Sequence, residues 1–330
     1  MRQVFARATL VVFVVLLSLA VVEKALRVVG YEYRPMSVKI GTTTDARYFH
    51  LFGDQHFIYD PELIWRPKPG YEIFNHQGFR GPEMTPEPES GVLRVVAIGD
   101  SNTLGWAGAD GSNWPAALGR AMEGARLPAE VVNGGVWGYS SFQGVRRMRE
   151  ALQYRPDIVL VSYGSNDAHR VHRPDREFAR KSKWFRVFER RFNHYRLGQL
   201  TTAATHRLRS RDGGELRPRV SLDEYKENLR EIVRSGREAG VQVVFLTRPF
   251  TGPIVDRSKW KNFAYDYNAA TVEVATAEGV PVIDLYSEFK GRGEYFRDES
   301  HFTTAGHELA GQIVFTELQP VIAAAVGELP

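Results

Sequence analysis

Short apolar runs alternate with longer amphipathic stretches along the chain from about residue 92 onward. Most of the runs are rich in valine and isoleucine and apolar throughout, which is typical of parallel strands covered on both faces. Because strand and helix patterns alternate, the sequence predicts a three-layer α/β/α domain with a parallel sheet. The runs cover residues 93–98, 131–133, 157–163, 241–246 and 280–285.

The clearest helical pattern is SLDEYKENLREIVRSGREAG, which begins at Ser221. Ser221 is a candidate N-cap, and Glu224 three residues later completes the pattern of a capping box. Gly240 ends the pattern as a C-terminal glycine. In open parallel sheets, ligands bind at the carboxyl ends of the strands, so we expect site residues in the segments that follow each strand.

The N-terminus is apolar over a length that suits a membrane span. Arg2 and Arg7 precede an uncharged, mostly apolar run over residues 8–22. A signal anchor would hold residues 4–22, which are about the 20 residues that a span needs, in the cytoplasmic membrane. The domain that follows would then be periplasmic or extracellular. Cleavage of a signal peptide, followed by secretion, is the alternative, and we expect the anchor on its length and flanks.

Composition divides the chain into three parts. Residues 1–29 are predicted as the signal anchor or transmembrane helix, 30–91 as an extension and linker, and 92–330 as the α/β domain. Residues 168–220 form a basic insertion with 15 Lys and Arg against 5 Asp and Glu.

Two interpretations of the basic insertion are equally well supported. The first is a lid or platform that contacts an anionic surface, such as lipid headgroups or an acidic polysaccharide. The second is an amphipathic helix packed on the core with a solvated basic face. Aromatic residues recur among its charges near helical spacing: Trp184, Phe185, Phe188 and Phe192.

Polar residues follow four of the five predicted strands. Ser101 lies in GDS after the first strand, and Asn166 lies in GSND after the third. The second strand is followed by the glycine-rich stretch NGGVWGYSS, and the fifth by DESH, which contains Asp298 and His301. Each segment alone also fits a turn or a helix cap. Together they supply a nucleophile, a base, a carboxylate that orients the base, and donors for an oxyanion.

In order and spacing, the four segments resemble the sequence blocks of the SGNH/GDSL hydrolases over roughly residues 92–326. The resemblance implies a flavodoxin-like sheet of order 2-1-3-4-5. It also implies that Ser101 is the nucleophile, His301 the base and Asp298 its orienting carboxylate. The N-terminal part, with VEKALR after the apolar run and NHQGFRGPE at residues 75–83, is similar to a membrane-anchored bacterial subgroup.

The same resemblance implies an oxyanion hole with three donors. These are the N–H of Ser101, the N–H of Gly138 in NGGVWG, and the side-chain amide of Asn166. Gly134 and Gly135 are second choices for the glycine.

Other chemistries find less support in the sequence. The chain has no cysteine, so it has neither disulfides nor a thiolate metal site. It lacks the HExxH spacing of a zinc site and the GxSxG turn of an α/β-hydrolase. We therefore expect neither a metal nor a cofactor, and no nucleic-acid partner for an exported domain.

The sequence favours a serine esterase that hydrolyses an O-acyl or O-acetyl ester on a glycan or a lipid. An O-acyltransferase that moves the acyl group to a cell-envelope polysaccharide uses the same residues, so it remains an alternative. A non-catalytic, membrane-anchored binding protein with the same fold is an alternative of another class.

Overall fold

The structure is a computed structural model of the 330-residue chain. The chain divides into two compact units, one of Met1–Ala46 with Arg180–Glu215 and one of Arg47–Ala179 with Leu216–Pro330. The residues that the structure describes are 2–31, 56–60, 62–105, 112–171, 174–179, 192, 194–211, 217–251 and 261–327.

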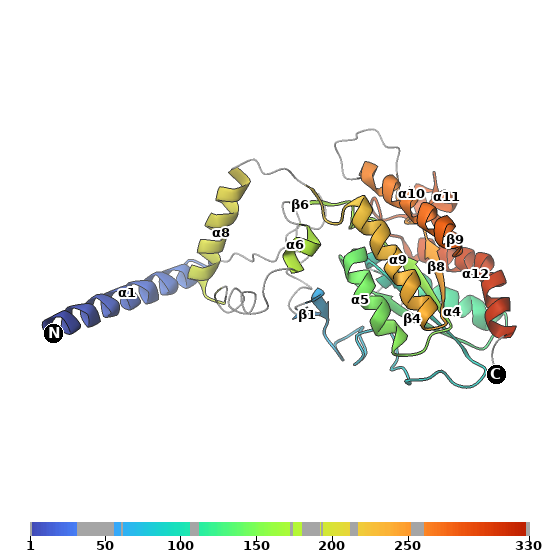
Figure 1. Ribbon diagram of the computed structural model, residues 1–330, viewed down its shortest axis with the longest axis horizontal. Helices are drawn as coiled ribbons and strands as arrows, with labels where there is room; N and C mark the ends of the chain where they lie inside the picture. The colour runs from blue at the N-terminus through green and yellow to red at the C-terminus, as the bar shows by residue number, and fades with distance from the viewer. Residues whose placement is uncertain are drawn as a thin grey trace. The chain divides into compact units, whose positions relative to one another are not determined.

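The larger unit is built on a five-stranded parallel sheet (Figure 1). The strands lie in the order β4-β3-β5-β8-β9, and each neighbouring pair is parallel. Numbered along the chain, this is the 2-1-3-4-5 order that the sequence resemblance implied, so the expected fold is confirmed. The strands are β3 (Leu93–Gly99), β4 (Ala129–Gly135), β5 (Ile158–Ser162), β8 (Gln242–Leu246) and β9 (Val282–Ile283).

Helices cover both faces of this sheet, which explains why most of the strand residues are apolar. Leu93, Val95 and Ala97 of β3 belong to one buried cluster with α4 (Trp114–Gly124) and α12 (Thr304–Gly327). Side chains alternate along a strand, so the intervening residues of β3 face the other layer.

The second helical layer consists of α5 (Ser141–Leu152), α9 (Leu222–Glu238) and α10 (Lys261–Glu278) (Figure 1). At Gly236, α9 approaches β8 so closely that a Cβ would lie 2.4 Å from Val243 Cγ2. The predicted N-cap of α9 is confirmed, because Ser221 Oγ accepts a hydrogen bond from the backbone N–H of Glu224 at 3.3 Å.

Short elements complete the larger unit. Two antiparallel ribbons pair β1 (Phe57–Asp60) with β2 (Ile64–Pro67) and β6 (Arg170–Val171) with β7 (Arg217–Pro218). The short helices are α3 (Ser101–Leu104), α6 (Asp175–Ala179), α11 (Leu285–Phe289) and the 3-10 turn η1 (Gly293–Tyr295).

The segment before the sheet contributes apolar side chains to the core of the larger unit. Phe57, Leu63, Trp65, Phe74 and Phe79 are all buried. These five residues are therefore packing residues of the larger unit.

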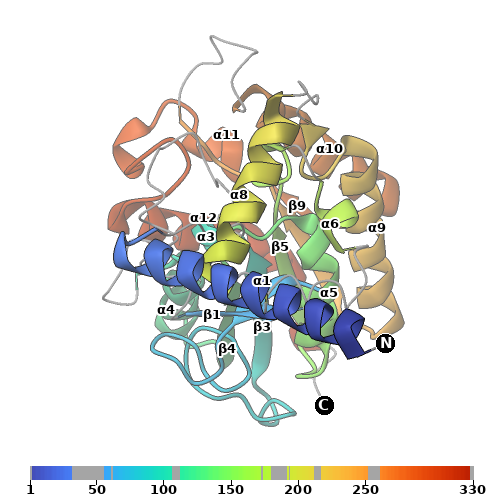
Figure 2. The ribbon, with the colours of Figure 1, turned by 90° about the vertical axis from the view of Figure 1, so that its left-hand side faces the viewer.

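The smaller unit contains α1 (Arg2–Val28) and α8 (Arg196–Arg211), which meet near the C-terminal end of α1 (Figure 2). The carboxylate of Glu23 on α1 accepts a hydrogen bond from the backbone N–H of Leu197 at 2.9 Å, at the first turn of α8. By length and composition α1 can cross a membrane, and a signal sequence has the same properties.

Part of the predicted lid, residues 172–173, 180–191, 193 and 212–216, lies outside the described residues. Trp184, Phe185 and Phe188 belong to that undescribed part, whereas Phe192 is described and is exposed.

Candidate active site

Ser101 is the first residue of α3, directly after β3. Asp100 is the N-cap of this helix, and its Oδ1 accepts a hydrogen bond from the N–H of Asn102 at 2.8 Å. Gly99 leaves room for the turn, because a Cβ there would lie 2.2 Å from Thr103 Oγ1. The serine therefore stands where the sequence predicted it, at a strand-to-helix turn on the carboxyl edge of the sheet.

Ser101, His301 and Asp298 form one hydrogen-bonded chain. Ser101 Oγ lies 2.8 Å from His301 Nε2, and His301 Nδ1 lies 2.8 Å from Asp298 Oδ2. The other carboxylate oxygen, Asp298 Oδ1, accepts the backbone N–H groups of Ser300 and His301 at 2.8 and 2.9 Å. A carboxylate can only accept, so Nδ1 donates to it and Nε2 remains as the acceptor for the serine hydroxyl.

The surroundings of Asp298 favour its ionised form. Burial by itself raises the pKa of this carboxyl. The hydrogen bond and charge of His301, together with the N–H groups of Ser300 and His301, outweigh burial and hold the pKa below its ordinary value. Asp298 is therefore a carboxylate at neutral pH and can stabilise a protonated His301.

Gly138 lies in a tight turn that follows β4. The turn is closed by a hydrogen bond from Tyr139 N to Val136 O at 3.3 Å, and the φ of Gly138 is +70°. A positive φ at the third residue is that of a type II turn, which favours glycine. Val136 N in turn donates to Gly99 O at 3.1 Å, so the turn is tied to the strand that leads to Ser101.

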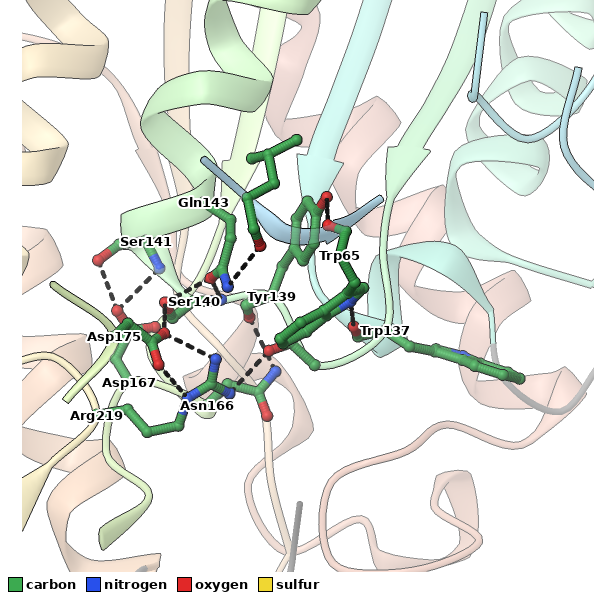
Figure 3. Close-up of polar contacts among 12 residues, drawn as sticks. Trp65, Trp137, Tyr139, Ser140, Ser141, Gln143, Asn166, Asp167, Asp175 and Arg219 are labelled. Carbon is green, nitrogen blue, oxygen red and sulfur yellow. Dashed lines mark hydrogen bonds and ion pairs between the residues drawn. The ribbon is translucent and has the colours of Figure 1, made fainter. Parts of the chain in front are cut away.

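The three expected oxyanion donors follow three adjacent strands, β3, β4 and β5. No described residue accepts a hydrogen bond from the backbone N–H of Ser101 or of Gly138. Asn166 Nδ2 donates one of its two N–H groups to Tyr139 O at 2.9 Å (Figure 3). Its second N–H can therefore donate to another acceptor.

The second-choice glycines lie within the sheet rather than in the loop. Gly134 and Gly135 pair with Ile98 and Gly99 of β3, and Gly135 N also donates to Asn133 Oδ1 at 2.9 Å.

Asp167, the last residue of GSND, links the loops after β4 and β5. Its Oδ1 accepts the backbone N–H of Ser141 at 2.9 Å, and its Oδ2 accepts the N–H of Gly164 at 3.1 Å. Burial raises the pKa of Asp167 to about 7, although the hydrogen bonds from Ser141 oppose the shift.

Arg248 is a buried site residue that sequence analysis missed. Its Nε donates to Asp100 Oδ2 at 3.0 Å, and its Nη1 donates to Ser300 O at 3.0 Å. Arg248 therefore connects the residue before Ser101 with the residue before His301. A signal was present, because Arg248 follows β8, the one strand for which no polar residue was singled out.

Arg80, in the GFRG stretch, binds the C-terminal end of α3. Its Nη1 donates to the carbonyl oxygens of Leu104 and Gly105 at 2.6 and 2.9 Å, at the end of the helix that Ser101 begins.

Within the described part of the chain, no group of three or more His, Cys, Asp or Glu side chains is arranged to hold a metal ion.

Comparison with solved structures yields bacterial esterases and acylhydrolases. A lipase/acylhydrolase from Enterococcus faecalis shares 22% identity at a TM-score of 0.49, covering 69% of this chain and 96% of that chain. The acetylxylan esterase Axe2 from Geobacillus stearothermophilus shares 18% identity at a TM-score of 0.48, covering 71% of this chain and 96% of that chain.

Comparison with curated proteins gives a partial match. An arylesterase from Vibrio mimicus is 30% identical over 82 residues, which is 24% of this chain and 41% of the arylesterase. The match thus spans less than half of that relative's length. By contrast, the family model described as GDSL-like lipase/acylhydrolase matches residues 97–309, more than half of this chain, and that span contains all four sequence blocks. The chain therefore belongs to the GDSL-like lipase/acylhydrolase family, the SGNH/GDSL hydrolases.

Proposed function

We propose that this protein is a serine esterase that hydrolyses a carboxylic ester through an acyl-enzyme on Ser101. The observation that carries the proposal is the chain of two 2.8 Å contacts from Ser101 Oγ through His301 to Asp298. It stands at the carboxyl edge of the sheet, inside the span that matches the family.

In the first half-reaction, Ser101 Oγ attacks the ester carbonyl carbon while His301 Nε2 takes the hydroxyl proton. The C–O bond to the alcohol then breaks, and His301 gives the proton to the leaving alcohol oxygen. In the second half-reaction, His301 takes a proton from water, the resulting oxygen attacks the acyl carbon, and Ser101 recovers its proton as the acid leaves. The ionised Asp298 stabilises the imidazolium in both halves.

The negative oxygen of each tetrahedral intermediate would be held by the N–H groups of Ser101 and Gly138 and by the amide of Asn166. Support comes from the two N–H groups without a described acceptor and from the second N–H of Asn166.

We further propose that the ester lies on a glycan or a lipid and that α1 anchors the protein in the cytoplasmic membrane. The apolar run of residues 8–22 after Arg2 and Arg7 supports this placement, with the catalytic domain in the periplasm or outside the cell.

The test combines turnover with covalent labelling of the full-length protein. Membrane and soluble fractions are treated with a fluorophosphonate, and p-nitrophenyl esters from acetate to dodecanoate are hydrolysed in parallel. We expect turnover and one phosphonyl adduct, on Ser101. We also expect the labelled protein in the membrane fraction, with its N-terminal peptide still attached. Labelling without hydrolysis would favour the acyltransferase. If the protein is neither labelled nor hydrolyses any of the esters, the proposal of an enzyme is overturned and the non-catalytic binding protein is favoured.

Asn166→Ala is expected to lower kcat by about 10²–10³-fold with little change in KM, because its amide donates mainly to the oxyanion of the transition state. Asn166→Asp preserves the size of the side chain but replaces the donor by a charge that repels the oxyanion, so its loss should be at least as large. Initial rates on p-nitrophenyl acetate measure both. A kcat of Asn166→Ala within twofold of the wild-type value would show that Asn166 is not a donor of the oxyanion hole.

A further inference from the structure

Three consecutive carbonyl oxygens in the loop after β4 each accept a hydrogen bond from the side chain of a distant segment (Figure 3). The orientation of three successive peptide groups is thus fixed from outside the loop, around the glycine whose N–H is the proposed oxyanion donor. The pairs are Trp65 Nε1 to Trp137 O at 3.0 Å, Arg219 Nη1 to Gly138 O at 2.8 Å, and Asn166 Nδ2 to Tyr139 O at 2.9 Å.

The bond from Trp65 sets the direction of the Gly138 N–H. In a trans peptide the C=O and the N–H point in opposite directions, so a donor on Trp137 O fixes the N–H of Gly138 on the other side. Type I and type II turns differ mainly by a flip of this central peptide. A flip would turn the Gly138 N–H toward the indole N–H and place two donors face to face.

Trp65 is itself held firmly in place. Its indole is buried and packs against the Tyr139 ring, with 5.7 Å between the ring centroids. The Tyr139 hydroxyl donates to the backbone carbonyl of Trp65 at 2.8 Å. Burial raises the pKa of Tyr139, so this hydroxyl keeps its proton and remains a donor.

Arg219 holds the next peptide and is anchored by an ion pair. Its Nε and Nη2 donate to the two carboxylate oxygens of Asp175 at 3.1 and 2.7 Å, and both side chains are buried. Asp175 Oδ2 also accepts the hydroxyl of Ser140 at 2.7 Å. Arg219 therefore binds the loop at Gly138, and Asp175 binds it at Ser140. The charges of the two buried side chains compensate each other.

We propose that Trp65 and Arg219 are positioning residues of the oxyanion hole, which hold the Gly138 N–H in the direction where it donates to the oxyanion. The inference rests on the proposed esterase function and assigns part of its site to Trp65, which lies before the span that matches the family.

The test is Trp65→Phe in the full-length protein, which removes the indole N–H and keeps an aromatic ring. We expect kcat on p-nitrophenyl acetate to fall about 10- to 100-fold, less than the loss of an oxyanion donor outright, with KM changed less than about threefold. Arg219→Lys keeps a positive charge beside Asp175 but loses the planar fork, and should lower kcat about 10-fold.

The matched control is Trp114→Phe. This indole is also buried, but it belongs to the core cluster around α4, so the substitution makes the same change of side chain away from the loop after β4. Its kcat should stay within about twofold of the wild type. Equal losses of kcat in Trp65→Phe and Trp114→Phe, or wild-type kinetics in Trp65→Phe, would overturn the proposal.

A second readout separates this inference from the esterase proposal. Amide hydrogen exchange, followed by mass spectrometry on the peptide that contains Tyr139, should be faster in Trp65→Phe and unchanged in Trp114→Phe, because the Tyr139 N–H closes the turn. Unchanged exchange in Trp65→Phe would overturn the proposal that Trp65 holds this turn. Absence of turnover in the wild type would overturn the esterase proposal. The hydrogen-exchange rates would still decide whether Trp65 holds the turn.

Discussion

Replacing Asp298 by asparagine is expected to lower kcat about 10⁴-fold, and replacing Ser101 by alanine about 10⁶-fold. Asparagine Oδ1 can still accept the backbone N–H groups of Ser300 and His301, so the loop geometry is preserved. Its Nδ2 amide, however, then faces His301 Nδ1 and can only donate. The ring must take the tautomer with a proton on Nε2, which cannot accept the proton of Ser101.

Steady-state rates of the purified variants on p-nitrophenyl acetate measure this graded loss. Asp223→Asn serves as the control, because Asp223 is an exposed carboxylate in the first turn of α9, and its rates should equal those of the wild type. An Asp298→Asn protein that keeps more than about one tenth of the wild-type kcat would show that tautomer control is not what this carboxylate does.

Arg248→Met is expected to destabilise the folded protein by about 3–5 kcal/mol, the usual cost of removing one partner of a buried ion pair. The side chains of Arg248 and Asp100 are 2% and 1% exposed, so the substitution leaves a buried carboxylate without its counter-charge. It also removes the donor to Ser300 O. Activity should fall along with stability, since the loops that carry Ser101 and His301 lose their common contact.

Urea denaturation of wild type and variant gives the free energy of unfolding. Arg146→Met is a matched control, because the Arg146–Glu62 pair has a similar distance, 2.8 Å, and lies on the surface. Its cost should stay below about 1 kcal/mol. Adding Asp100→Asn to Arg248→Met should recover part of the loss. If Arg248→Met costs no more than the surface control, the buried pair does not stabilise the fold.

The sheet and the four polar segments were predictable because their signals are local. Apolar runs of β-branched residues mark buried strands, and the carboxyl edge of a parallel sheet gathers whatever follows them. The contact of Asp298 with His301 spans three residues, a separation that a sequence shows directly.

The supporting side chains were not predictable, because their contacts depend on how distant segments meet in space. Arg248 and Asp100 are 148 positions apart, Arg219 and Gly138 81, and Trp65 and Trp137 72. No periodicity within a window of the sequence encodes such pairs. A buried arginine also looks like any solvated arginine until its burial is known.

The location of Trp65 and Arg80 has a consequence for where the functional domain begins. A chain cut at Leu93 would keep every strand of the central sheet and all four sequence blocks. It would lose the donor to Trp137 O and the donor to Leu104 O, and would expose the rings on which Phe57 and Phe79 pack. The larger unit therefore begins before residue 97, where the family match starts, because the side chains of Trp65 and Arg80 hydrogen-bond to its loops and the rings of Phe57 and Phe79 pack on it.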